Sequence, residues 1–421
     1  MYLPRSSKWS MNRRKRRPNY FSLALLILIV LFGYYFNQIY LPTQPNPFEP
    51  TPTPTRSPES FVTEAQALFA EGKLLPAVGA YQQAINSSPQ DSSLYVSLAR
   101  TQVFAGQYEE AQKNAENALL LNPNNALAYG VHAWALDFQG RNSEAQASIQ
   151  EALRLDPNNA LIHAYYVEIL INTGFEGYEK AAEESRVALA LDPDLVETRR
   201  ARALILEATG NYEEAIAEYQ AAININPNIS SLYIGLGLNY RILQVYDKAV
   251  EAFTRANALN PSDPFPDLYI SRTYATIGEY AKSLQYAETA VQDRPDDASL
   301  RGNLGVMYYR NFYWPEAIQQ LGYTIYGGVT EDGVEIEGIP LVNDIRVAEY
   351  YYTYGLALAR TNQCGEALQI AQMIQARVPA DENAQFAAGE IIRICEEALD
   401  NPPANTPVPT GAETPAATST P

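Results

Sequence analysis

The chain has 421 residues and a net charge of −18 at neutral pH. The first 19 residues hold seven basic side chains and no acidic ones, so their charge of +7 leaves −25 on the rest of the chain. Because nothing beyond this terminus offers a basic stripe that could neutralise phosphates, the charge distribution argues against a nucleic-acid partner.

An apolar segment follows the basic amino terminus, which comprises residues 1–19. As a helix, residues 20–41 would measure about 33 Å, enough for one bilayer crossing. Tyr34, Tyr35 and Tyr40 would then lie at the far membrane interface. The basic residues are expected to hold the amino terminus in the cytoplasm, so the segment predicts a single-pass protein of the cell membrane whose remainder is extracytoplasmic.

Two alternatives to this anchor are a cleaved signal peptide and a buried helix. Large aromatic residues, rather than small ones, follow the apolar run, which argues against a cleavage site. Residues 42–57 are rich in Pro and Thr and predict an extended linker between the anchor and the rest of the chain. Residues 400–421 have a similar composition and predict a disordered tail.

Prolines recur at nearly constant spacing through the middle of the chain. Successive gaps are 34, 34, 36, 34, 34 and 34 residues, between Pro89, Pro123, Pro157, Pro193, Pro227, Pro261 and Pro295. A proline cannot continue a helix, so each one ends a helix and sets the turn into the next. Glycines such as Gly106 and Gly210 fall near the middle of each period and divide it into two helices of about a dozen residues.

Small residues keep the same period and indicate where helix backbones approach closely, as in the column Ala111, Ala145, Ala181, Ala215 and Ala249. The stretches Leu-Gly-x-x-Tyr (Leu236 to Tyr240), Gly-x-Tyr-x-x-Ala (Gly106 to Ala111) and Asn/Asp-Pro resemble the tetratricopeptide repeat. The resemblance covers residues 58–399.

This resemblance implies an all-α fold, a right-handed superhelical solenoid of about nine helix-turn-helix repeats. The solenoid would occupy residues 58–381, and an amphipathic helix over residues 382–399 would cap its open end. An insertion within about residues 325–346 interrupts the period. Alternating residues around Asp332-Gly333 predict a β-hairpin there, either as a binding element or as a tolerated decoration.

The sequence offers little for catalysis. His132 and His163 have no further Cys or His at ligand spacing, so they are interpreted as packing or surface residues rather than as a metal site. Nucleophile elbows, phosphate-binding glycine loops and zinc-protease motifs are missing from the sequence. The expectation is a protein that is no enzyme and takes no cofactor or metal.

Function is therefore expected on the surface. In the resembled family the first helices of the repeats line a concave groove that holds a protein or peptide ligand. Outward positions there predict a peptide groove formed by Arg100, Trp134, Tyr165, Arg200, Phe265, Tyr269, Arg272 and Tyr352. Some of these aromatics could instead pack between neighbouring repeats. The main hypothesis is a membrane-anchored scaffold or adaptor, and the alternative is a structural or assembly subunit of a cell-envelope complex.

The chain contains two cysteines, Cys364 and Cys395. Cys364 opens the second helix of the ninth repeat, and the capping helix from residue 382 runs back over a similar number of residues. The two sulfurs should return to the same level on antiparallel neighbours, which predicts a disulfide that persists outside the cytoplasm. Two inert buried thiols are the alternative.

Overall fold

The computed structural model describes residues 19–40 and 56–400. The chain divides into two units, Met1–Arg56 and Ser57–Pro421. Nearly all of the predicted basic terminus and tail, and most of the predicted linker, lie outside the described residues.

The amino-terminal unit contains the predicted apolar helix. It consists of α1 (Tyr20–Tyr35) followed by one turn of π-helix, η1 (Phe36–Tyr40). By length and composition, the segment Tyr20–Gln38 can cross a membrane, and within that segment no side chain is buried. A signal sequence near the amino terminus has the same properties.

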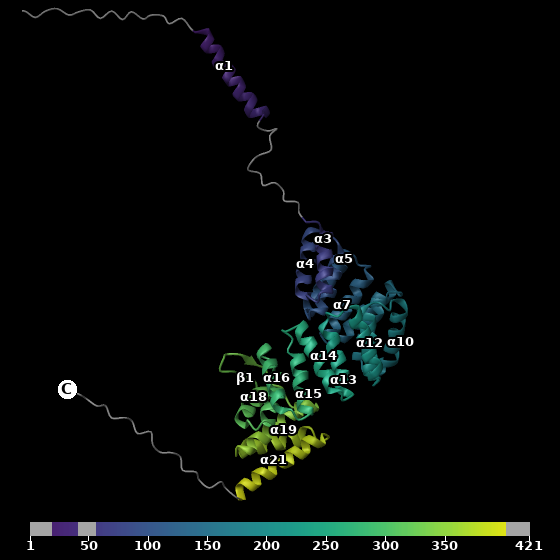
Figure 1. Cartoon of the computed structure of the whole chain (residues 1–421), viewed down its shortest axis with the longest axis vertical. Helices are drawn as coiled ribbons and strands as arrows, with labels where there is room; N and C mark the ends of the chain where they lie inside the picture. Colours follow the sequence, from purple (N-terminus) through teal and green to yellow (C-terminus); the bar gives the residue numbers. More distant parts are fainter. Residues whose placement is uncertain (1–18, 41–55, 401–421) are drawn as a thin grey trace, which may run out of the picture. The chain divides into compact units, whose positions relative to one another are not determined.

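The second unit is a stack of helix pairs (Figure 1). Nine pairs lie within residues 56–400. Their first helices are α3 (Pro58–Ala70), α5 (Ser92–Phe104), α7 (Ala126–Phe138), α9 (Ala160–Asn172), α11 (Val196–Ala208), α13 (Ser230–Ile242), α15 (Phe265–Thr276), α17 (Ala298–Arg310) and α19 (Ile345–Arg360). Their second helices are α4 (Leu74–Ser87), α6 (Tyr108–Leu121), α8 (Asn142–Leu155), α10 (Phe175–Leu191), α12 (Tyr212–Ile225), α14 (Tyr246–Leu259), α16 (Tyr280–Asp293), α18 (Trp314–Tyr326) and α20 (Cys364–Arg377). A capping helix, α21 (Glu382–Asp400), follows.

Capping residues and glycines in the sequence explain where these helices begin and end. Asp91, Asn125 and Asp297 each accept a hydrogen bond from a backbone N–H in the first turn of the helix that follows, satisfying donors that the helix cannot. Gly106 and Gly210 adopt the left-handed conformation that ends a first helix. The periodic alanines are fully buried. The structure thus confirms the all-α solenoid of about nine repeats with a capping helix.

The insertion contains a short hairpin. Strand β1 (Gly328–Val329) pairs antiparallel with β2 (Glu335–Ile336), and Gly328 lies opposite Ile336. Ile336 and Leu341 are buried, and Leu341 belongs to the core beneath the last repeats. Tyr351 of α19 donates a hydrogen bond to the carbonyl of Ile339 at 2.8 Å. The insertion therefore packs onto the ninth repeat.

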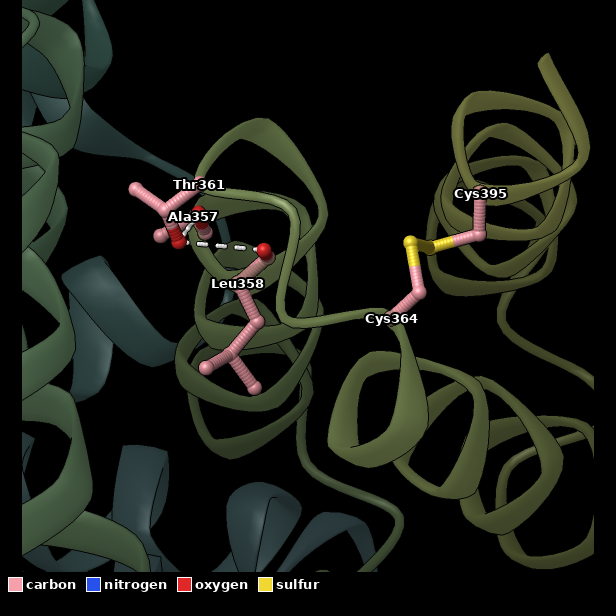
Figure 2. Close-up of a disulfide and its surroundings, with 5 residues drawn as sticks. All are labelled: Ala357, Leu358, Thr361, Cys364 and Cys395. Atoms are coloured by element: carbon pink, nitrogen blue, oxygen red, sulfur yellow. Dashed lines mark hydrogen bonds between the residues drawn. A yellow bond between two sulfur atoms is a disulfide. The ribbon is translucent and has the colours of Figure 1, made fainter. Parts of the chain in front are cut away.

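The cap is joined to that repeat by the predicted cysteine pair. Figure 2 shows the side chains of Cys364, at the start of α20, and Cys395, on α21, meeting as a disulfide. Their Cα atoms are 5.5 Å apart, within the usual range for a bridge. Cys395 is fully buried, whereas Cys364 is partly exposed.

The solenoid also closes on itself. At the end of the first repeat's first helix, the carbonyl of Ala70 accepts a hydrogen bond of 2.9 Å from the side chain of Asn228, which lies just before α13 of the sixth repeat. Gly72 packs closely against the same residue, since a Cβ at Gly72 would lie 2.4 Å from the Asn228 carbonyl oxygen. Residues 158 positions apart are thus in contact, so the first repeats curl back onto the fifth and sixth.

Gly72 and Gly106 provide a matched test of this closure. Both have φ of +76°, but a Cβ at Gly106 would meet nothing within 4 Å. Gly106→Ala should cost about 1 kcal/mol of left-handed strain alone. Gly72→Ala should lower the free energy of unfolding by about 1 to 3 kcal/mol more, because backbone must move to admit the methyl group. Urea unfolding measures both, and equal losses would mean that this contact is not formed.

The pKa values of the two histidines are shifted in opposite directions. Burial alone would lower the pKa of His163, but hydrogen bonds to Glu184 and to the Pro157 carbonyl, 2.9 Å away, outweigh it and raise the pKa. For His132, burial lowers the pKa despite Glu116, 3.5 Å from its Nε2. Within residues 19–40 and 56–400, no three His, Cys, Asp or Glu side chains are arranged to hold a metal ion.

These opposite shifts predict opposite pH dependence. A raised folded-state pKa stabilises the fold below the unfolded value, about 6.5, and this contribution disappears as pH rises through the folded pKa. The stability advantage of wild type over His163→Gln should therefore shrink from acidic to alkaline pH. For His132→Gln it should shrink toward acidic pH, because that pKa is lowered. Urea titrations across this range test both, and the same trend in both variants would contradict the assignment.

Candidate functional site

Aromatic side chains fill the inner surface of the first five repeats. Trp134 and Tyr165 are only 1% and 0% exposed, and their rings stack with centroids 4.5 Å apart. Phe104 packs edge-on against Trp134 at 5.2 Å and against Phe69 at 5.3 Å. Phe69 and Phe104 also contact the core cluster of the fifth and sixth repeats, which includes Val196. Side chains from opposite parts of the coil thus meet across its interior.

Two ion pairs accompany these rings. Arg100 donates to Glu197 at 2.6 Å, across 97 residues of sequence, and Glu197 is 1% exposed. Arg200 donates to Glu168 at 2.8 Å, and the other oxygen of that carboxylate accepts from the Trp134 indole at 2.9 Å. Burial raises the pKa of Glu168, although Arg200 and Trp134 oppose the shift. Both arginines here are therefore paired with carboxylates within the solenoid.

These positions correct part of the predicted peptide groove. The prediction that Trp134 and Tyr165 contact a ligand is wrong, because neither side chain reaches solvent. Arg100 and Arg200 bind internal carboxylates rather than pointing to an open groove. The repeat period correctly places all four residues on first helices. It does not reveal that the solenoid curves so tightly that side chains from distant repeats fill its interior.

An open cavity lies farther along the first helices. It has a volume of about 340 Å³ and its walls come from α15, α17 and α19, with Tyr280 at the start of α16. Its polar lining includes Arg272, which the sequence predicted, together with Asn303, Arg310, Arg346, Glu349 and Tyr350. Unlike the interior of the first five repeats, this space is not closed by side chains from a distant repeat.

Hydrogen bonds fix the wall of this cavity. Arg272 donates to the Asn303 side-chain oxygen at 3.3 Å and approaches the Tyr350 hydroxyl at 3.5 Å. Tyr350 donates in turn to the carbonyl of Ser299 at 3.1 Å. The Tyr350 ring packs against Gly302, and a Cβ at that position would lie only 2.8 Å from the ring atoms. Glycine is therefore needed there to bring α17 and α19 together. The guanidinium of Arg272 is thereby held on a rigid wall.

Three other predicted groove residues lie in the same half of the solenoid, and all are partly exposed: Phe265, Tyr269 and Tyr352. Burial raises the pKa of Tyr269, and the nearby charges of Arg272 and Arg241 oppose that shift. Burial, with the adjacent Glu349, raises the pKa of Tyr352 to about 12. The charges of Arg272 and Glu349, which line the cavity, thus act on Tyr269 and Tyr352, although neither tyrosine lines it.

A larger cavity, of about 570 Å³, opens on α12, α13 and α14. Its tyrosine rings are already covered, since Lys248 lies over Tyr240 at 5.3 Å and Arg255 over Tyr233 at 5.9 Å. Its wall carries Lys248 and Arg255 against Glu251, a smaller excess of positive charge than the three arginines and one glutamate on the smaller cavity. The smaller cavity on α15, α17 and α19 is therefore the better candidate for specific recognition.

Sequence reasoning missed Arg310, Arg346 and Glu349. Arg310 ends α17 and Arg346 lies in the first turn of α19, so neither occupies the mid-helix position of most predicted groove residues. The insertion before α19 also obscures its register with the other repeats. Arg241, Arg272, Arg310 and Arg346 lie in four different repeats, so no local run of basic residues in the sequence marks them.

Comparisons with known proteins agree with this architecture. Family models described as tetratricopeptide repeat match residues 80–113, 126–159, 230–263 and 270–329, and one described as TPR repeat matches residues 205–241. No curated protein matches the chain at a significant level.

Among solved structures, the APC/C hetero-tetramer Cut9–Hcn1 is similar with a TM-score of 0.57 and 14% identity, covering 88% of this chain and 82% of that one. A tetratricopeptide repeat protein from Parabacteroides merdae has a TM-score of 0.41 and 16% identity, with coverage of 59% and 98%. PilF of Pseudomonas aeruginosa has a TM-score of 0.41 and 22% identity, covering 47% of this chain and 88% of that one. At these identities the similarity concerns the fold alone. With its helix pairs and the matching family models, the chain belongs to the tetratricopeptide repeat family.

Proposed function

We propose that this chain is a membrane-anchored scaffold that presents a peptide-binding surface of its later repeats outside the cytoplasm. The observation that carries the proposal is the open cavity on α15, α17 and α19, next to a coil whose interior is already filled. Tetratricopeptide repeats typically serve as non-catalytic scaffolds for protein–protein interaction. Tyr269, Phe265 and Tyr352 would extend the surface, since aromatic residues supply large contact area at low entropic cost.

The anchoring part of the proposal depends on the first forty residues. An apolar helix directly after a cluster of arginines supports an uncleaved anchor with a cytoplasmic amino terminus. The repeats would then lie in an oxidising compartment, where a disulfide persists. The pairing of Cys364 with Cys395 is consistent with that location.

The disulfide gives a test of both the bridge and the compartment. Protein taken from cells under acid quench, then denatured without reductant, should contain no reactive thiol. Closing a loop of this length should contribute about 3 to 4 kcal/mol on the chain-entropy model, so Cys364→Ser should lower the free energy of unfolding by about that amount. The same variant is the control for detection, because its remaining Cys395 must titrate as one thiol. Two reactive thiols in the wild type would contradict the bridge and the oxidising location together.

Site-specific crosslinking tests the binding surface. A photoreactive amino acid at Thr276, an exposed residue on the cavity wall, should form adducts with another protein in the native host. The matched position is Gln285, which is exposed on α16 but does not line the cavity. Adducts from Thr276 that are missing from Gln285 are the expected result. Equal adducts from both positions, or none from Thr276, would contradict the proposed surface.

A further inference from the structure

The cavity on α15, α17 and α19 carries an excess of positive charge. Its wall holds three guanidinium groups, those of Arg272, Arg310 and Arg346, against the single carboxylate of Glu349. The chain as a whole has a net charge of −18, so a local excess of this sign is opposite to the rest of the molecule. We name these four residues the arginine cluster.

Within the arginine cluster, one carboxylate serves two arginines. Arg346 lies 3.0 Å from Glu349, and Arg310 lies 3.8 Å from the other oxygen of the same group. Both arginine side chains are about half exposed, at 50% and 45%, so their remaining N–H groups can reach a ligand. Arg272 has no carboxylate within ion-pairing distance among residues 19–40 and 56–400, and its partners there are the neutral Asn303 and Tyr350.

A fourth cation, Arg241, is affected by the charges of this wall. Burial lowers the pKa of Arg241, and the like charges of Arg272 and Arg346 lower it further. Like charges gathered in a partly buried place repel one another, and the repulsion is relieved when an anion binds among them. In the first five repeats, by contrast, the charges of Arg100 and Arg200 are each balanced by a buried glutamate of the solenoid itself.

We propose that the arginine cluster binds the carboxylates of an acidic peptide segment belonging to a protein partner. The inference rests on the proposed function, which supplies a peptide ligand for this surface, and it adds the chemistry of that ligand. A guanidinium offers parallel N–H donors that match both oxygens of a carboxylate, and three of them on separate helices favour an extended segment with several carboxylates. Glu349 would compete with the ligand for Arg310 and Arg346.

Binding of a dye-labelled oligoglutamate peptide to the full-length chain in detergent tests this inference by fluorescence anisotropy. The double variant Arg272→Gln/Arg346→Gln should weaken binding by about tenfold or more, as expected when charged anchors are lost. The matched control removes two exposed arginines elsewhere, Arg186→Gln/Arg255→Gln, and should bind as wild type does. Wild-type affinity should fall as salt rises, and an oligolysine peptide should not bind.

A gain of affinity provides a test that misfolding cannot imitate. Glu349→Gln removes the internal competitor while keeping the size of the side chain, so oligoglutamate should bind several-fold more tightly. Amidating the carboxyl terminus of the probe identifies the source of the carboxylates. Unchanged binding supports recognition of side-chain carboxylates, whereas loss of binding would assign the site to a single terminal carboxylate and contradict the acidic segment.

The inference is overturned if wild type does not bind oligoglutamate, if the two double variants lose affinity equally, or if Glu349→Gln weakens binding. Its failure can be told apart from failure of the proposed function. Crosslinks from Thr276 to a host protein that persist in Arg272→Gln/Arg346→Gln would leave the scaffold in place while rejecting an acidic ligand. Missing crosslinks in wild type would reject the scaffold itself.

Discussion

The contact between the first repeat and the turn before the sixth determines what the inner surface of this solenoid can do. Most repeats pack through the same column of buried alanines, but the hydrogen bond from Asn228 to Ala70 joins residues that no repeat unit brings together. The glycine at position 72 permits that approach, because any side chain there would meet the backbone of Asn228. Once the coil closes, its interior becomes a core, and the residues that would line a groove become packing residues.

This closure divides the molecule into two halves with different chemistry. In the first five repeats, aromatic stacking surrounds two ion pairs, Arg100–Glu197 and Arg200–Glu168, and each cation is satisfied. In the later repeats the surface stays open, and the arginines outnumber the acids that face them. The insertion and the capping helix stabilise the ninth repeat of this open part, through the Tyr351 hydrogen bond and the cystine between α20 and α21. Rigid helices thereby hold guanidinium groups at fixed positions, which reduces the entropic cost of binding.

The fold could be predicted from the sequence because its determinants are local. Proline and glycine at fixed spacing set the helix ends, and the Asp332-Gly333 pair marked the turn that joins the two short strands. The groove could be predicted only in part. Periodicity shows which face of a helix points inward, but small changes of angle between repeats accumulate over the stack and decide whether that face meets solvent or another repeat. Trp134 and Tyr165 were misassigned for that reason, while Arg272 belongs to the half that stays open.

The central claim is that the amino-terminal coil is closed in solution, and a distance across the closure tests it most directly. Spin labels at Glu71 and Ser231, both exposed, would flank the contact between Ala70 and Asn228. Pulsed electron paramagnetic resonance on the full-length chain in detergent should give one short, narrow distance distribution. A long or broad distribution would show an open coil and would return Trp134 and Tyr165 to the list of residues that a ligand could reach.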